Sequence, residues 1–322
     1  MAHFAFFGTP EFAVPALEGL QQFCLKNGHT LAMVVCQPDK PSHRGKKIHA
    51  PPVKNLAVKY NLSICQPSSL KKDTPDGDDF YAAFQKAHID IAIVVAYGRI
   101  IPRRFLGITP FGFINIHGSI LPRWRGASPI QHALLSGDLE TGVSIMALVP
   151  ELDAGDVYRT VSIPIKASDD AITLSKTLAQ IGKEALLECL PLLLTKTLPK
   201  IPQASEGITY ASLLEKKSGE IKWHLSAREI VNHCRAMQPW PGSYTFHKGA
   251  VLRLFNAATL DVNEPKSQLA PGTVTGASTY LSVQTSDGIV SFYEAQLDGK
   301  KRLPIKELLN GYSFKVGDIL GL

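Results

Sequence analysis

Two polar side chains interrupt an apolar run at residues 113–117 and could carry acid–base or oxyanion chemistry. In an extended strand alternate residues face the same side, so Asn115 and His117 would point together while Ile114 and Ile116 point the other way. A buried sheet displays two polar side chains on one face only where each has a partner. Because the run ends in a glycine, the pair would lie near the carboxyl end of the strand, where ligands bind in open α/β sheets.

These side-chain types suit acyl transfer to an amine. Asn115 offers a neutral amide N–H that can stabilise a developing oxyanion, and His117 can accept or pass on the amine proton near neutral pH. Ser119 lies two residues on, but no G-x-S-x-G nucleophile elbow is present, so direct attack by the amine is simpler than a covalent route. The alternative is that the pair only satisfies backbone groups of a loop.

A carboxylate, Asp153, follows a second predicted strand at residues 143–149. It would lie on the loop at the end of that strand, beside His117, where it could orient the imidazole. The run from Glu151 to Asp156 is also ordinary turn chemistry, so a turn-forming acid is the alternative interpretation.

The elements that must position these residues alternate between strands and helices in the first half of the chain. We predict helices at 11–25, 53–60, 78–87 and 171–194, and strands at 3–7, 31–36, 63–65, 91–95, 113–117, 143–149 and 157–163. This alternation is typical of an α/β fold, a Rossmann-like, mostly parallel sheet with helices on both faces. The turn at Gly8 lacks the G-x-G-x-x-G pattern, so no dinucleotide site is predicted.

The composition changes after about residue 195. The stretch 196–218 contains Pro199, Pro202 and Gly207 and has few apolar runs, so we interpret it as a linker. Beyond it, a helix at 227–237 precedes short strands at 242–247, 251–257, 272–274, 281–285 and 289–295, a spacing that predicts a small, OB-like β-barrel. The predicted organisation is a catalytic domain at 1–195, a linker at 196–218 and a β-barrel domain at 219–322.

Length and composition narrow the class of protein. The 322 residues exceed one usual domain, and the hydrophobic fraction of 45% is enough for a sizeable core. The net charge of +6 permits an anionic partner such as nucleic acid. Five widely spaced cysteines disfavour a disulfide framework or a zinc site and fit a reducing cytoplasm. No apolar run reaches the ~20 residues of a membrane span, and the N-terminus lacks the basic region of a signal peptide.

Longer motifs resemble the methionyl-tRNA formyltransferase family over essentially the whole chain. The central match is N-I-H-G-S-I-L-P-R-W-R-G-A-S-P-I at 115–130. The others are F-G-T-P-E-F-A at 7–13, Q-P-D-K at 37–40, R-G-K-K at 44–47, A-Y-G at 96–98, W-H-L-S at 223–226 and Q-P-W-P at 238–241. The Asn-x-His pair with its Asp is common to all 10-formyltetrahydrofolate formyltransferases and indicates the chemistry, whereas the P-R-W-R-G extension and the C-terminal half narrow the acceptor.

The resemblance implies transfer of a formyl group from 10-formyltetrahydrofolate, as co-substrate, to the α-amino group of methionyl initiator tRNA, for translation initiation. It implies Asn115, His117 and Asp153 as the catalytic trio, and no metal. The implied folate contacts are Ser119, Ile120, Leu121, Pro122 and Tyr97. The loop at 37–54 would contact the tRNA through Lys40, Arg44, Lys46 and Lys47. We expect a cytoplasmic monomer with no membrane partner.

Two departures from the family pattern are visible. The sequence Ser-Ile-Leu-Pro at 119–122 replaces the family's Ser-Leu-Leu-Pro, which is a conservative change. In the linker, the family's Thr-Tyr-Ala segment is often followed two residues later by a lysine, where this chain has Leu213. That exchange removes the basis for a tRNA contact at this position, although Lys216 and Lys217 lie just beyond.

Three alternatives stay open from the sequence. A formyltransferase acting on glycinamide ribonucleotide is disfavoured by the basic loop and the second half of the chain. One acting on a nucleotide-sugar amine is usually fused to a dehydrogenase domain, for which this chain is too short. A tRNA-binding protein without catalysis is disfavoured by the intact Asn115, His117 and Asp153.

Overall fold

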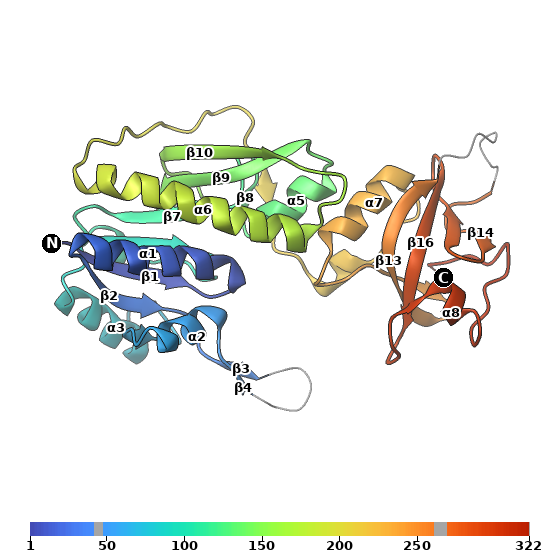
Figure 1. Ribbon diagram of the computed structural model, residues 1–322, viewed down its shortest axis with the longest axis horizontal. Helices are drawn as coiled ribbons and strands as arrows, with labels where there is room; N and C mark the ends of the chain where they lie inside the picture. The colour runs from blue at the N-terminus through green and yellow to red at the C-terminus, as the bar shows by residue number, and fades with distance from the viewer. Residues whose placement is uncertain (42–47, 261–268, 322) are drawn as a thin grey trace. The chain divides into compact units, whose positions relative to one another are not determined.

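The computed structural model describes residues 1–41, 48–260 and 269–321 and divides into two compact units (Figure 1). The first comprises Met1–Pro129, Glu140–Pro164 and Ser175–Ser212, and the second comprises Ile130–Leu139, Ile165–Leu174 and Leu213–Leu322. Residues 196–212, predicted as linker, therefore belong to the first unit. The division into catalytic domain, linker and barrel domain stays a prediction.

The sheet of the first unit has seven strands in the order β10-β9-β7-β6-β1-β2-β5. Strands β5, β2, β1, β6 and β7 run parallel to one another, whereas β9 is antiparallel to both its neighbours. The Rossmann-like, mostly parallel sheet is thereby confirmed. Its strands are β1 (His3–Gly8), β2 (Thr30–Val35), β5 (Ile64–Cys65), β6 (Ile91–Val95), β7 (Phe113–His117), β9 (Glu140–Ala147) and β10 (Val157–Pro164).

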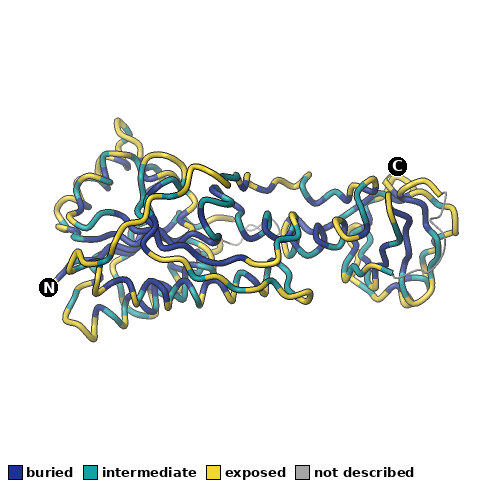
Figure 2. Tube along the Cα trace, turned by 90° about the horizontal axis from the view of Figure 1, so that it is seen from above, coloured by how far each residue is buried: buried dark blue, intermediate teal, exposed yellow. Residues whose placement is uncertain are grey.

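Different helices cover the two faces of this sheet. On one face, Phe7 and Phe113 pack against Phe84 of α3 (Pro75–Lys86). On the other, Ile116 contacts α6 (Ala171–Leu194), because a Cβ added at Gly182 would lie 2.8 Å from its Cγ2 atom. Figure 1 shows α6 and α1 (Val14–Asn27) on the same side of the sheet, and Figure 2 shows buried residues concentrated along the strands. The helix α2 is Pro52–Lys59.

The structure corrects several predicted boundaries of the first unit. The helix predicted from residue 11 begins as a 3-10 turn, η1 (Glu11–Ala13), and α3 begins at Pro75 because proline suits the first turn of a helix. Strand β9 begins and ends earlier than predicted because it pairs with β10 from Glu140 onward. The sequence pattern did not predict the short helix α4 (Arg103–Leu106). It also did not predict four short strands that depend on pairing with each other: β3 (Lys40–Pro41), β4 (Ile48–His49), β8 (Arg125–Gly126) and β11 (Tyr210–Ala211).

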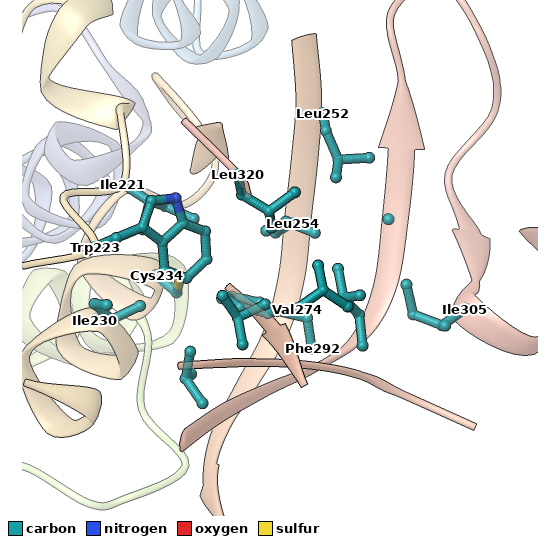
Figure 3. Close-up of a cluster of buried hydrophobic side chains, with 14 of the residues drawn as sticks. Ile221, Trp223, Ile230, Cys234, Leu252, Leu254, Val274, Phe292, Ile305 and Leu320 are labelled. Carbon is teal, nitrogen blue, oxygen red and sulfur yellow. The ribbon is translucent and has the colours of Figure 1, made fainter. Parts of the chain in front are cut away.

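The second unit is built on a curled antiparallel sheet in the order β12-β13-β16-β15-β14, with β17 (Leu303–Pro304) paired to β16. Trp223, Ile230 and Phe292 lie in its hydrophobic core (Figure 3). The OB-like fold class is confirmed. The strands are β12 (Tyr244–His247), β13 (Ala250–Leu260), β14 (Val274–Ala277), β15 (Leu281–Gln284) and β16 (Ile289–Leu297), and the helical segments are α5 (Pro129–Leu135), η2 (Lys216–Gly219), α7 (Ala227–Ala236) and α8 (Ile305–Leu308).

Local chemistry explains where two of these elements begin. Helix α7 starts where predicted because Ser226 and Glu229 form a reciprocal capping box, each side chain bonding the other's backbone N–H. The strand predicted at 272–274 is present but begins only at Val274, since Gly272 has a φ of +92°, outside the extended region.

None of the helices in the described part of the chain is long and apolar enough to cross a membrane. Within the same residues, no three or more His, Cys, Asp or Glu side chains are grouped to hold a metal ion. All five cysteines are free thiols.

Candidate active site

Strand β7 carries the two polar residues between two neighbouring strands. Asn115 is paired with Val94 of β6 and with Met146 of β9, so its backbone is held on both sides. Its side chain and that of His117 share the face of Phe113, opposite Ile116 and helix α6. Both side chains are nearly buried, with 8% and 5% of their residue surfaces exposed.

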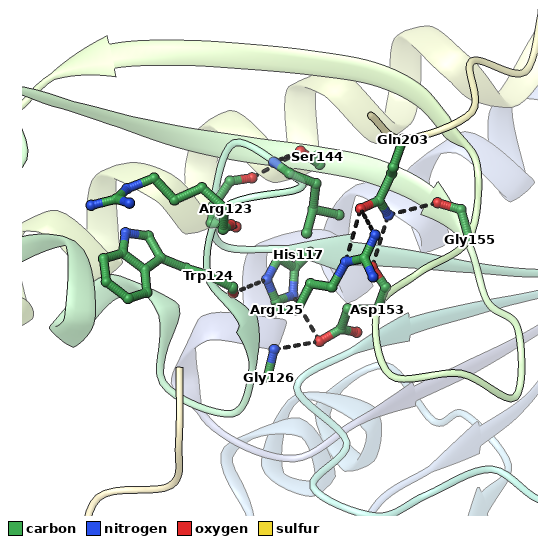
Figure 4. Close-up of polar contacts among 11 residues, drawn as sticks. His117, Arg123, Trp124, Arg125, Gly126, Ser144, Asp153, Gly155 and Gln203 are labelled. Carbon is green, nitrogen blue, oxygen red and sulfur yellow. Dashed lines mark hydrogen bonds and ion pairs between the residues drawn. The ribbon is translucent and has the colours of Figure 1, made fainter. Parts of the chain in front are cut away.

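The His117 imidazole is engaged at both ring nitrogens (Figure 4). Its Nε2 atom lies 2.8 Å from the carbonyl oxygen of Trp124, and its Nδ1 atom lies 3.6 Å from Asp153 Oδ2. Because a carbonyl only accepts hydrogen bonds, we assign the hydrogen to Nε2. The distance to Asp153 is that of an ion pair rather than a hydrogen bond, and it places the carboxylate beside the imidazole.

The loop that carries Asp153 approaches His117 from a direction that the order of the strands along the chain does not indicate. Because β9 is antiparallel to β7, the end of β9 at Ala147 is paired with Ile114, at the start of β7, and not with His117. The pairing continues one residue further, through the hydrogen bond from Leu148 N to the carbonyl of Phe113, and the loop then turns back, so that the Asp156 carbonyl accepts from Ala147 N. Asp153 lies on the loop after the strand and beside His117, as predicted, but the loop must return along β7 to bring them together.

The Asp153 carboxylate is fixed by a second contact. Its Oδ2 atom accepts a hydrogen bond of 2.8 Å from the backbone N–H of Gly126, and Asp153 itself has a φ of +46°. Gly126 has a φ of +120°, and a Cβ there would lie 2.5 Å from the carbonyl oxygen of Ala211. Only glycine fits this position without a shift of backbone, so the donor to Asp153 is held in place.

The Asn115 side chain makes no hydrogen bond with any residue that the structure describes. His117 does contact a loop carbonyl, that of Trp124, whereas no such contact is present for Asn115 among the described residues. Its polar atoms are not among the enclosed side-chain atoms that lack a partner, so they are open to solvent. Its N–H group is available to an oxygen atom of a ligand.

The loop after β7 is stabilised by Ser144 of β9, which sequence reasoning missed. The Ser144 hydroxyl donates to the carbonyl of Ser119 at 2.8 Å and accepts from the N–H of Leu121 at 3.2 Å. The Ser119 hydroxyl in turn donates to the carbonyl of Arg123 at 2.6 Å. A serine between the apolar residues Val143 and Ile145 was the available signal, because a buried hydroxyl needs a partner.

The five predicted folate contacts are not equally accessible. The side chains of Ile120 and Pro122 are partly exposed, whereas those of Ser119 and Leu121 are buried and leave mainly backbone groups. The Tyr97 ring lies in the hydrophobic core, where burial raises the pKa of its hydroxyl to about 12. That hydroxyl has no hydrogen-bond partner among the described residues. These folate contacts stay predictions.

The predicted tRNA contacts are only partly described. Lys40 lies in the short strand β3, and its Nζ atom donates to Gln37 Oε1 at 2.8 Å. Gln37 Nε2 donates to the carbonyls of Tyr97 and Gly98, at 3.0 and 3.1 Å, which anchors the start of this loop beyond the end of β6. The other three predicted contacts, Arg44, Lys46 and Lys47, lie outside the described residues.

We expect Gly155→Ala to destabilise the protein, because the loop of Asp153 packs tightly against β9. A Cβ at Gly155 would lie 1.9 Å from the carbonyl oxygen of Ala147, so the backbone must move, at a cost of about 1–3 kcal/mol. Thermal unfolding measures the change. Gly107→Ala is the matched control, since its Cβ would meet nothing within 4 Å. An unchanged melting temperature for Gly155→Ala would contradict the tight packing.

The arrangement offers two chemical functions side by side. The Asn115 amide can donate to an oxygen that gains negative charge during a reaction. The His117 imidazole, backed by the Asp153 carboxylate, can hold or move a proton. Ser119, the nearest hydroxyl in the motif, is occupied by the Arg123 carbonyl, which leaves addition of an external nucleophile as the simplest use of the site.

Sequence comparison finds relatives along the whole chain. A profile described as formyl transferase matches residues 2–190, and one described as formyl transferase, C-terminal domain, matches residues 213–313. The methionyl-tRNA formyltransferase of Caldicellulosiruptor saccharolyticus is 39% identical over 98% of this chain and 98% of its own. That of Methylococcus capsulatus is 40% identical over 96% of each chain.

Solved structures share the fold at lower identity. WlaRD, a sugar 3N-formyl transferase crystallised in the presence of dTDP and 5-N-formyl-THF, aligns with a TM-score of 0.66 and 19% identity over 94% of this chain and 99% of its own. HypX from Aquifex aeolicus, in complex with tetrahydrofolic acid, aligns with a TM-score of 0.60 and 18% identity over 95% of this chain and 46% of its own. At such identities the likeness concerns the fold alone.

Proposed function

Because this chain belongs to the methionyl-tRNA formyltransferase family, we propose that it transfers the formyl group of 10-formyltetrahydrofolate to the α-amino group of methionine carried by initiator tRNA. The observation that carries the chemistry is the unpartnered Asn115 amide beside the His117 imidazole and its carboxylate. The proposed role is translation initiation in the cytoplasm, with the enzyme acting as a monomer.

In the proposed mechanism the amine of methionyl-tRNA attacks the formyl carbon, and no covalent enzyme intermediate forms. The carbonyl oxygen becomes a tetrahedral oxyanion, which Asn115 stabilises through its amide N–H. Once substrate displaces the Trp124 carbonyl, the imidazole carries its hydrogen on Nδ1, beside Asp153, and Nε2 accepts the amine proton. The new Nε2–H group then donates to the oxyanion. The bond between the formyl carbon and folate N10 then breaks, and the proton lost by the amine passes through His117 to N10.

Asp153 supports this step from the side of Nδ1. When His117 takes up the amine proton, its ring carries a positive charge, and the carboxylate 3.6 Å away stabilises that charge. Gly126 N–H keeps the carboxylate oriented throughout. Asn115, His117 and Asp153 are therefore the proposed catalytic residues.

Substrate contacts are proposed from the accessible groups around the trio. Ile120, Pro122 and the backbone of Ser119 and Leu121 would contact the folate, since they lie on the loop that begins directly after His117. The basic loop that holds Lys40 would contact the tRNA, together with Arg44, Lys46 and Lys47. Cationic side chains near an RNA contribute salt-dependent, largely sequence-independent affinity.

A formylation assay tests the proposed function. With 10-formyltetrahydrofolate as donor, we expect rapid transfer to methionyl initiator tRNA and much slower transfer to methionyl elongator tRNA. The two substrates carry the same amine, so the difference measures recognition of the tRNA. Failure of both tRNAs to accept the formyl group, with folate still bound, would reject this acceptor and direct attention to sugar-nucleotide amines.

A further inference from the structure

The stretch predicted as linker sends one side chain into the candidate active site. Gln203 Oε1 accepts hydrogen bonds from Nε and Nη2 of Arg125, at 3.1 and 2.7 Å. Gln203 Nε2 donates to the backbone carbonyls of Asp153 and Gly155, both at 2.8 Å (Figure 4). A single amide therefore joins the loop after β7 to the loop after β9.

The hydrogen bonds between Gln203 and Arg125 provide an acceptor for a buried, charged guanidinium group. Arg125 is 9% exposed and forms no ion pair with any described residue. A buried guanidinium needs acceptors for its N–H groups, and Gln203 supplies one oxygen to two of them. The charged guanidinium of Arg125, which has no carboxylate partner among the described residues, therefore holds the segment around Gln203 in place.

The segment is also held by its backbone on both sides of Gln203. Before it, Ile201 exchanges two hydrogen bonds with Val157 at the start of β10, at 2.8 and 2.9 Å. After it, Thr209 accepts from the backbone N–H of Trp124 through its hydroxyl and from that of Arg125 through its carbonyl, both at 2.9 Å. Gln203 is therefore presented to the two loops by a fixed stretch of chain.

The Asp153 half of the contact bears on the chemistry. Asp153 has a positive φ of +46°, a conformation that is uncommon for residues other than glycine. Gln203 binds the carbonyl of Asp153 itself and that of Gly155, two residues on. These bonds fix the backbone from which the carboxylate reaches Gly126 N–H and His117 Nδ1.

We propose that Gln203 is a positioning residue for formyl transfer, which sets the Asp153 carboxylate, and through it the His117 imidazole, in the orientation that the reaction uses. The inference rests on the proposed function for its rate measurements. Gln203 bonds none of the three catalytic side chains, so its effect must pass through the backbone of Asp153.

Two variants separate the halves of the contact. Gln203→Met keeps a similar volume and removes every hydrogen bond. Gln203→Glu keeps acceptors for Arg125 but loses the donor and sets a carboxylate against two carbonyls. We expect both to lower kcat by about tenfold to hundredfold, with little change in KM for either substrate, because small misplacements of catalytic groups have effects of this size. Gln180→Met is the matched control, since Gln180 is exposed and its side chain bonds only Glu184 among the described residues.

A double-mutant cycle distinguishes positioning from general destabilisation. If Gln203 acts through Asp153, Gln203→Met should add little to the rate loss of Asp153→Asn, because the group that it positions is already lost. A structural role alone would lower the melting temperature and give additive rate losses. Wild-type kcat in folded Gln203→Met and Gln203→Glu, or full additivity in the cycle, would overturn the inference.

Hydrogen exchange at the Gly126 amide gives a readout that does not depend on the proposed acceptor. This amide is bonded to the Asp153 carboxylate, so we expect faster exchange in Gln203→Met and in Asp153→Ala, and no change in Gln180→Met. Unchanged exchange in Gln203→Met would refute the positioning role. A wild-type enzyme that formylates no tRNA, with the expected exchange pattern, would refute the proposed function and leave the positioning of Asp153 intact.

Discussion

Replacing Asn115 by alanine should lower the single-turnover rate of formyl transfer by roughly 100- to 1,000-fold, because one preorganised oxyanion donor contributes about 3–4 kcal/mol to transition-state stabilisation. The amide lies on the same face of β7 as His117, near the carboxyl end of the strand. The effect should fall on the rate and leave folate affinity nearly unchanged, since the oxyanion exists only during the reaction. Rapid quench with excess enzyme measures this rate directly.

Stability should not explain this loss. The Asn115 side chain has no hydrogen bond to any described residue, so its removal leaves no protein group without its partner. Asn115→Asp provides the matched comparison, because it keeps the shape of the side chain while an ionised carboxylate can only accept. We expect it to be at least as slow as Asn115→Ala. If either variant kept most of the wild-type rate, Asn115 would have no role in stabilising the oxyanion.

The sequence predicted β6, β7 and α6 with their observed bounds, because their patterns are local. A continuous apolar run specifies a buried strand, and three- and four-residue spacing specifies a helix, whatever the rest of the chain does. The alternation within β7 also placed Asn115 and His117 on one face. In contrast, β8 and β11 are two-residue strands that exist only because they pair with each other.

The contact between Asp153 and His117 could be predicted only in part from the sequence pattern. The place of Asp153 on the loop after a strand, beside His117, was predicted, but the antiparallel direction of β9 and the return of its loop were not. Strand direction is decided by the whole sheet and not by the residues of the strand. The role of Gln203 could not be predicted from the sequence, because its partner Arg125 is 78 residues away in the chain and the residues around it have the composition of a linker.

Asp153→Asn should give a second large loss, on the order of 100- to 10,000-fold in single-turnover rate, because the imidazole loses the negative charge that stabilises its protonated form during transfer. In the Ser-His-Asp hydrolases the equivalent change lowers kcat by about 10⁴-fold while the geometry stays intact. The asparagine can still accept from Gly126 N–H, so the loop should keep its conformation.

Asp156→Asn is the control for this variant, because Asp156 lies on the same loop and the hydrogen bond that it accepts there is through its backbone carbonyl, which the substitution leaves in place. We expect it to retain wild-type activity. The comparison separates the effect of the carboxylate that lies 3.6 Å from His117 Nδ1 from the effect of removing any negative charge on the loop. Equal, small losses in the two variants would mean that Asp153 serves only as a turn residue. A large loss confined to Asp153→Asn would make the imidazole and carboxylate one proton-transfer unit, with Asn115 acting separately on the oxyanion.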